Sequence, residues 1–185
     1  MLDPNFDPFP VLETERLVLY QLTFADTEGI FQLRGNPVAM RYIGKPVLEH
    51  LSEAEVLIRH YQDQLHSANG ITWGIRLKNL NEPLVGIIGF HRLEKQNYRA
   101  EIGYMIHPDY WGKGMMSEAI QIVLKYGFES MGLHSVEARI NPDNEQSANI
   151  LNRNGFVKEA YLKESYCFEG HFYDSEIYSL LVSDK

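Results

Sequence analysis

The sequence predicts an α+β domain in which helices flank a single, mostly antiparallel mixed sheet. Three observations lead to this class. Short apolar runs are joined by brief polar links, longer segments repeat apolar residues at the helical period, and helices and strands do not alternate one for one. The 185 residues suit one domain, 1–185, with the Pro-rich residues 1–10 as an extended arm.

The first half of the chain should begin with a strand at 17–20, a short helix at 25–35 and a longer helix at 51–67. Ser52 and Glu55 form the expected capping box of the longer helix. The helical period predicts its buried face, which consists of Ala54, Leu57, Ile58, Tyr61 and Leu65.

Three strands should follow in close order, at 71–78, 84–92 and 100–107, the last of them stopped by Pro108. The polar links at 79–82 and 94–97 suit antiparallel hairpins.

The rest of the chain should form a helix at 117–131 closed by Gly132, a strand at 136–140 and a helix at 145–154. A hairpin of two strands, 156–168 and 172–182, completes a sheet of about seven strands.

Composition limits the possible partners and compartment. The formal net charge of −8 disfavours direct binding to nucleic acid or anionic membranes and favours cationic partners. The one cysteine, Cys167, excludes an intrachain disulfide and indicates a reducing compartment. The N-terminus lacks the basic and apolar regions of a secretory signal, and no apolar run reaches the ~18 residues of a membrane span. A cytoplasmic protein is therefore expected.

A turn with the pattern Gly-x-Gly, Gly112 to Gly114, lies directly before the helix predicted at 117–131. Glycines let the backbone approach a ligand closely, and a helix N-terminus attracts anions, so this turn can hold a pyrophosphate. The same pattern also fits a tight bend that needs glycine for a positive φ. The segment matches neither a dinucleotide fingerprint nor a Walker loop.

Further motifs extend this pattern. They are Glu13-Thr-Glu-Arg-Leu-Val-Leu19, Trp111-Gly-Lys-Gly114 with Glu118-Ala119, Asn144-x-x-Ser147, Asn154-Gly-Phe156 and Tyr173-Asp174. In their order and spacing the chain resembles the GNAT superfamily of acyl-CoA-dependent N-acetyltransferases, and within it the RimJ/RimL-like group, which includes acetyltransferases of ribosomal-protein N-termini. The resemblance covers about residues 12–182.

The resemblance implies a GNAT fold whose sheet is splayed at the site for acetyl-CoA, the co-substrate. Backbone N–H groups of residues 112–117 would hold the pyrophosphate, and the pantetheine would pair with the end of the strand at 104–107. The residues implied in coenzyme binding are Met105, Ile106, His107, Trp111, Gly112, Lys113, Gly114, Met115, Met116, Ser117 and Asn144. Trp111 stands where the superfamily often has Gln or Arg. Met116 replaces a small residue, so its side chain either narrows the turn or points into the core.

The chemistry requires a base and help for the leaving group. A protonated amine must lose a proton before it attacks a thioester, and Glu101, on the strand beside the expected thioester, is the candidate base. The other interpretation of Glu101 is a surface or paired strand residue. A backbone N–H near Ile106 would polarise the thioester carbonyl. Many superfamily members assist the thiolate with a tyrosine where this chain has Leu151. Ser147 is the candidate here, although its hydroxyl could equally bond the first turn of its helix.

Two other chemistries fit less well. Cys167, His171 and Asp174 are the members of a conceivable thiol triad, but all three fall on one predicted hairpin. The seven histidines show no metal-binding spacing, so no metal site is predicted.

The expected function is therefore transfer of an acetyl group from acetyl-CoA to a primary amine, directly and in a ternary complex. By resemblance, the acceptor would be the N-terminal amine of a protein. The alternatives are a small-molecule amine or polyamine acetyltransferase, and a non-catalytic acyl-CoA-binding or interaction domain. Loops 36–50 and 92–99 are expected to shape the acceptor pocket, and a homodimer is conceivable.

Overall fold

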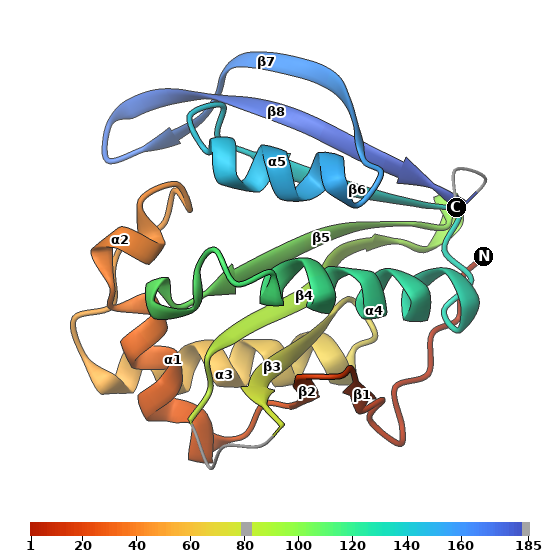
Figure 1. Ribbon diagram of the computed structural model, residues 1–185, viewed down its shortest axis with the longest axis horizontal. Coiled ribbons are helices and arrows are strands. Elements are labelled where there is room, and N and C mark those ends of the chain that lie inside the picture. The colour runs from red at the N-terminus through yellow and green to blue at the C-terminus, as the bar shows by residue number, and fades with distance from the viewer. Residues whose placement is uncertain (79–82, 183–185) are drawn as a thin grey trace.

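The computed structural model describes residues 1–78 and 83–182, which form one mixed sheet flanked by helices (Figure 1). Its eight described strands follow the order β1-β2-β3-β4-β5-β6-β8-β7. The strands are β1 Leu12–Glu13, β2 Leu17–Gln21, β3 Ile71–Leu77, β4 Gly86–Glu94, β5 Arg99–Ile106, β6 Ser135–Ile140, β7 Val157–Phe168 and β8 His171–Leu181. The α+β class is confirmed. The expected strand number of about seven was one short, because the two residues of β1 are too few to show alternation.

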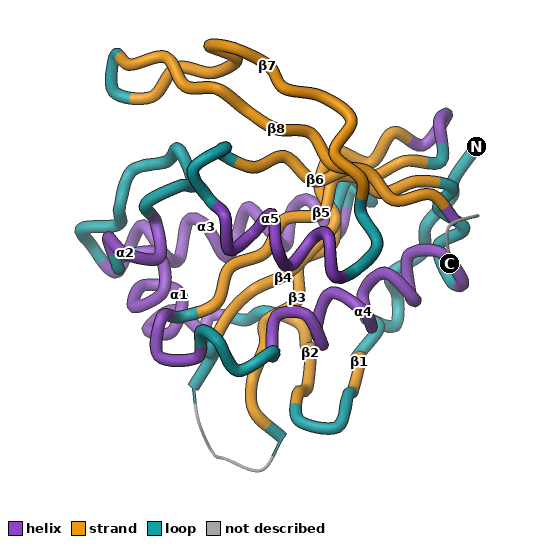
Figure 2. Tube along the Cα trace, turned by 45° about the horizontal axis from the view of Figure 1, so that its top comes forward, coloured by secondary structure: helices purple, strands orange, loops and turns teal. Residues whose placement is uncertain are grey.

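The helices occupy both faces of the sheet. They are α1 Thr27–Arg34, α2 Pro37–Met40, α3 Leu51–His66, α4 Met115–Glu129 and α5 Glu145–Arg153, with short 3₁₀ turns at Phe24–Asp26, Lys95–Asn97 and Pro108–Tyr110. Helix α4 packs its buried side on one face, and α1 and α3 cover the opposite face (Figure 1). The β7–β8 hairpin projects beyond the helices (Figure 2). Two separate buried clusters, one on each face, hold the layers together.

One strand pair gives the sheet its functional shape. All neighbouring strands pair antiparallel except β5 and β6, which run parallel. Their register covers only residues 99–101 against 135–137. Beyond Glu101 and Glu137 the two strands separate, so the second half of β5 has an edge without a strand partner on that side among the described residues.

The start of α3 corrects one prediction. The capping box consists of His50 and Glu53, and the Glu53 carboxylate accepts hydrogen bonds from the backbone N–H groups of Glu49 and His50, each at 2.8 Å. The expected pair of Ser52 and Glu55 lies two residues too far along, because the helix already begins at Leu51. The predicted buried face is confirmed: Ala54 and Ile58 are fully buried, and its other three members pack at the margins of the two clusters.

Other boundaries follow the glycines. Gly132 and Gly155 adopt the positive φ that ends a helix, at 74° and 87°. Helix α4 starts two residues earlier than expected, immediately after Gly114.

The N-terminal arm is anchored on the core, since Leu2 and Phe6 are both buried. The hairpin link expected at 79–82 lies outside the described residues.

Candidate active site

A cavity of about 370 Å³ opens where β5 and β6 separate, between the N-terminal end of α4 and the length of α5. It brings together most of the residues implied in coenzyme binding, together with the candidate Ser147. The predicted residues that line it are Met105, Ile106, Trp111, Gly112, Gly114, Met115, Met116, Ser117, Asn144 and Ser147. His107, Lys113 and Glu101 were also predicted and do not line it.

The turn before α4 has the geometry of an anion-binding loop. Gly112 and Gly114 have φ values of 72° and 75°, a region that other residues rarely adopt. A Cβ atom at Gly112 would meet nothing within 4 Å, so the turn is open to a ligand on that side. The fifteen-residue helix α4 begins directly behind it and adds the partial positive charge of its N-terminus.

Two side chains settle how this turn is built. The Trp111 indole N–H donates to the Ile106 carbonyl at 2.8 Å, which ties the turn to the end of β5. Met116 is 4% exposed and belongs to the hydrophobic cluster under α4. Its side chain therefore packs into the core and also borders the cavity.

The end of β5 offers backbone groups to the cavity. The His107 N–H donates to the Val85 carbonyl at 2.8 Å, on the β4 side. Because successive residues of a strand direct their backbone groups to opposite sides, the N–H and C=O of Ile106 point away from β4, toward the gap. The bond from Trp111 to the Ile106 carbonyl agrees with this direction. The Ile106 N–H is thus in position to bind an acyl oxygen or an extended ligand chain.

Ser147 forms a pair that the sequence analysis missed. Its backbone N–H donates to the Asn144 side chain at 3.1 Å, and its hydroxyl lies 2.6 Å from the hydroxyl of Tyr104 on β5. The Ser147 side chain therefore bonds Tyr104 and not a backbone group of its helix. Burial raises the pKa of Tyr104 to about 12, so this phenol stays protonated. Strand alternation could have found Tyr104, because it places residue 104 on the same face as residue 106.

Glu101 lies at the last paired position of β5, on the face that α1 and α3 cover. It is opposite His91 on β4 and Glu137 on β6, and its side chain is 21% exposed. A β-bulge in β4 gives Arg92 a φ of 47°, and the Arg92 guanidinium binds the Glu101 carboxylate at 2.8 Å. Burial raises the pKa of Glu101, while Arg92 and Arg139 act in the opposite direction. Glu101 is thus a paired strand residue whose carboxyl pKa is raised by burial.

The conceivable thiol triad does not assemble in the described part of the chain. Cys167 is exposed on β7 and pairs with Phe172. The Asp174 carboxylate accepts instead from the Tyr161 hydroxyl at 2.5 Å and from a backbone N–H, and His171 contacts a backbone carbonyl. Within residues 1–78 and 83–182, no group of three metal-ligating side chains is found. None of the helices in those ranges is long and apolar enough to cross a membrane.

The splayed sheet, the glycine turn at a helix N-terminus and the free edge of β5 define an N-acetyltransferase of the acyl-CoA-dependent class. The chain belongs to the acetyltransferase (GNAT) domain family, whose model matches residues 16–157.

Several curated relatives carry related names. The chain is 40% identical over 173 residues to the uncharacterized N-acetyltransferase YoaA of Bacillus subtilis, covering 94% of this chain and 97% of the relative. It is 36% identical over 78 residues to the ribosomal-protein-serine acetyltransferase of Escherichia coli, covering 42% and 44%. To the spermidine N(1)-acetyltransferase of the same species it is 25% identical over 134 residues, covering 72% and 69%. The RimJ/RimL-like resemblance is confirmed.

Solved structures share the fold. A GNAT-family acetyltransferase from Bacillus anthracis matches with a TM-score of 0.82 and 28% identity, over 93% of this chain and 98% of that one. RimL, a ribosomal α-N-protein acetyltransferase in complex with coenzyme A, gives 0.85 and 19%, over 95% and 100%. Spermidine N-acetyltransferase from Vibrio cholerae, in complex with coenzyme A and spermine, gives 0.80 and 24%, over 92% and 98%.

Proposed function

We propose that this protein transfers an acetyl group from acetyl-CoA to the N-terminal amine of a protein, directly and within a ternary complex. The observation that carries the proposal is the single cavity that joins the Gly112–Gly114 turn, the free edge of β5 and the Ser147 hydroxyl. A pyrophosphate, a pantetheine chain and a thiolate need these three features in this order.

The binding roles follow from the backbone. The N–H groups of residues 112–117 bind the pyrophosphate, and the N-terminus of α4 adds favourable charge. The pantetheine arm pairs with the free edge of β5 as an added strand would. The Ile106 N–H binds the thioester oxygen and stabilises the oxyanion that forms when the amine attacks.

Glu101 removes the proton from the acceptor ammonium. It does not line the cavity, so the proton passes through an intervening water. Its raised pKa brings the carboxylate closer to the pH at which the enzyme works, which improves a base toward an amine. The deprotonated amine then attacks the thioester carbon and becomes positively charged at nitrogen in the tetrahedral intermediate. The carbon–sulfur bond breaks as the intermediate collapses, the nitrogen loses its extra proton to solvent, and the thiolate leaves.

Ser147 assists the departing thiolate. The Ser147 hydroxyl has one proton, so it can donate to sulfur while it stays bonded to Tyr104 only if Tyr104 is the donor in that bond. Tyr104 lies at 2.6 Å and can be that donor, because burial raises its pKa to about 12 and keeps it protonated. The pair donates a hydrogen bond to the thiolate and needs no charged acid.

The surroundings of Glu101 favour a protein N-terminus over a polyamine. A polyamine carries several positive charges and requires unpaired carboxylates, whereas Glu101 pairs with Arg92 and the neighbouring Glu137 pairs with Arg99 and Arg139. The relatives support both acceptors, because one is named for a ribosomal protein and another for spermidine. The net charge of −8 is the observation that keeps the polyamine as second candidate.

One experiment separates these functions. The protein is incubated with acetyl-CoA and a panel of N-terminal peptides, spermidine and other small amines, and the products are identified by mass spectrometry. Acetylated peptide N-termini with slower transfer to spermidine support the proposal. Preferential spermidine acetylation selects the second candidate. Tight coenzyme binding without transfer to any amine would identify a non-catalytic acyl-CoA-binding domain.

A further inference from the structure

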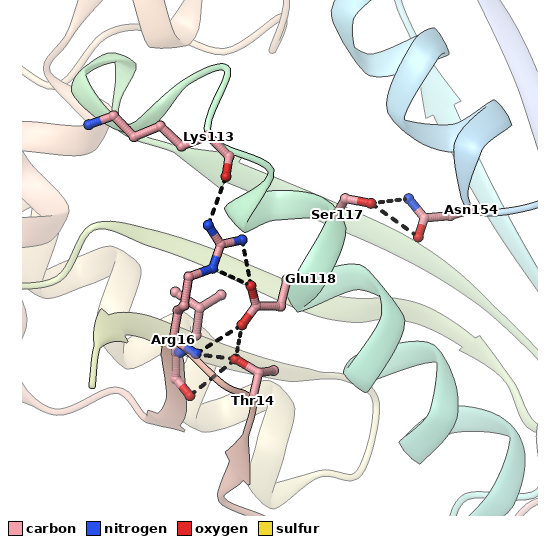
Figure 3. Close-up of polar contacts among 7 residues, drawn as sticks. Thr14, Arg16, Lys113, Ser117, Glu118 and Asn154 are labelled. Atoms are coloured by element: carbon pink, nitrogen blue, oxygen red, sulfur yellow. Dashed lines mark hydrogen bonds and ion pairs between the residues drawn. The ribbon is translucent and has the colours of Figure 1, made fainter. Parts of the chain in front are cut away.

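Arg16, in the turn between β1 and β2, reaches across to the start of α4 (Figure 3). Its Nη1 donates to the Lys113 carbonyl at 2.9 Å. Its Nε and Nη2 contact Oε2 of Glu118 at 2.7 and 2.6 Å, and its backbone N–H contacts Oε1 at 3.1 Å. The Thr14 hydroxyl also donates to Glu118. One arginine therefore joins the glycine turn to the first turn of the helix behind it.

The bond to Lys113 determines where the next N–H points. In a trans peptide the C=O of one residue and the N–H of the next point in opposite directions. The Lys113 carbonyl points toward Arg16, so the Gly114 N–H points away from Arg16. Gly114 lines the cavity, and a Cβ added to it would lie 3.7 Å from Arg16 Nη2. Arg16 thus supports the turn from behind and directs this N–H to the ligand side.

The contacts between Arg16 and Glu118 balance the charge at the start of α4. A carboxylate in the first turns of α4 opposes the attraction that a helix N-terminus exerts on an anion. The pKa of Glu118 is lowered, since its bonds to Thr14 and Arg16 outweigh the opposing effect of burial, so it stays ionised. The Arg16 guanidinium provides the compensating positive charge at 2.6 Å.

We propose that Arg16 is a positioning residue for coenzyme binding, which orients the Gly114 N–H and neutralises Glu118 beneath the pyrophosphate. This inference rests on the coenzyme site of the proposed function and does not depend on the acceptor. It also gives a physical role to the segment at 13–19 that the motif comparison singled out.

The test compares coenzyme A with pantetheine, which lacks the pyrophosphate. Binding is measured directly, by calorimetry for coenzyme A and by NMR titration for pantetheine, on wild type, Arg16→Gln and Arg16→Lys. Lys78→Gln is the matched control, because Lys78 pairs with Glu13 and the Thr14 carbonyl in the same segment without touching the turn. Circular dichroism confirms that each variant is folded.

The expected result is a coenzyme A affinity at least tenfold weaker in Arg16→Gln, with pantetheine affinity unchanged within twofold. The coenzyme A affinity of Arg16→Lys should lie between those of wild type and Arg16→Gln. An ammonium group can neutralise Glu118 but cannot also bridge to the Lys113 carbonyl. Lys78→Gln should bind both ligands as wild type does. Unchanged coenzyme A affinity in Arg16→Gln, or an equal loss for both ligands, would overturn the proposal. The assay measures coenzyme binding and not acetyl transfer. It therefore remains valid even if the wild-type protein acetylates no amine.

Discussion

The hydroxyl of Tyr104 lies 2.6 Å from that of Ser147, so one hydrogen bond connects β5 with the first turn of α5 across the gap in the sheet. Each residue comes from one side of the cavity, and both line it. In this arrangement the serine proton is free for a ligand whenever the tyrosine is the donor.

Removal of either hydroxyl should slow the leaving-group step. Ser147→Ala loses one hydrogen bond to the thiolate, at about 1–3 kcal/mol, which corresponds to a roughly 5- to 150-fold lower kcat. The KM for acetyl-CoA should change little. Tyr104→Phe should act in the same direction, and the double variant should be no slower than the slower single one, because the two hydroxyls act as one unit. Cys167→Ala is the control and should remain fully active; a folded but inactive Cys167 variant would instead require an acyl-cysteine intermediate.

Glu101→Gln tests the base. The substitution keeps the shape and removes the charge, so the rate at neutral pH should drop by roughly 10²–10⁴ while the Kd for acetyl-CoA stays constant. Steady-state kinetics and calorimetry provide the two readouts. An active Gln variant with an unaltered pH profile would leave Glu101 with a structural role only.

Arg92→Gln should move the pH profile without removing the base. Arg92 lowers the pKa of Glu101 against the raising effect of burial, so its loss should raise that pKa further. The acidic limb of kcat/KM should therefore shift to higher pH. Lys95→Gln, in the turn that follows β4, serves as a charge-matched control and should leave the limb in place.

Gly112→Glu tests the anion site, because Gly112 lines the cavity and a Cβ there would meet nothing within 4 Å. A carboxylate in the turn should weaken coenzyme A binding at least tenfold, or about 1.4 kcal/mol. The strain of a positive φ complicates this variant, so Gly170→Glu is the control: its φ is 78°, nothing lies within 4 Å, and it sits at the tip of the β7–β8 hairpin. Equal affinities in the two variants, measured by calorimetry, would contradict the assignment.

His91 should make the fold sensitive to acid. Burial lowers its pKa from 6.5 to about 4, with His60 and Arg92 acting in the same direction. Between these values the unfolded chain binds a proton that the folded chain does not, so stability falls as pH falls from about 6.5 to 4. The contribution is about 1–3 kcal/mol after discounting for partial solvent access. Urea unfolding at pH 7 and 4.5 should show this loss in wild type and a smaller one in His91→Gln; equal losses would rule out His91 as the cause.

Local sequence signals predicted most of the fold. Helical periodicity located α3, α4 and α5, and alternation or apolar runs located all strands except β1. The errors arose where a signal was short or depended on tertiary contacts. Helix α2 has four residues, and the cap of α3 depends on where the chain enters the helix.

The site was predicted less completely, for a physical reason. The glycine turn is a local feature, so sequence spacing reveals it. The Tyr104–Ser147 bond joins residues 43 positions apart, and the Arg16–Glu118 contact joins residues 102 apart. Such contacts depend on how β5 and β6 diverge. This divergence cannot be predicted from the residue pattern of any short stretch of the sequence. The resemblance implies Lys113 and His107 in coenzyme binding; neither is among the residues that line the cavity, and their part in binding stays a prediction.

The short pairing of β5 with β6 also affects how the sheet opens locally in solution. Strands β1–β5 and β6–β8 are two hydrogen-bonded ladders that share only three residue pairs, so each can open as a separate cooperative unit. Amide protons at residues 104 and 106 face the seam and should exchange with solvent deuterium faster than those at 87 and 88 in the middle of β4. A ligand whose amide groups pair with β5 along the seam would slow the exchange of these amide protons and hold the two ladders together. Occupancy of the site by the ligand could therefore be followed by the mass increase from deuterium uptake, before any product forms.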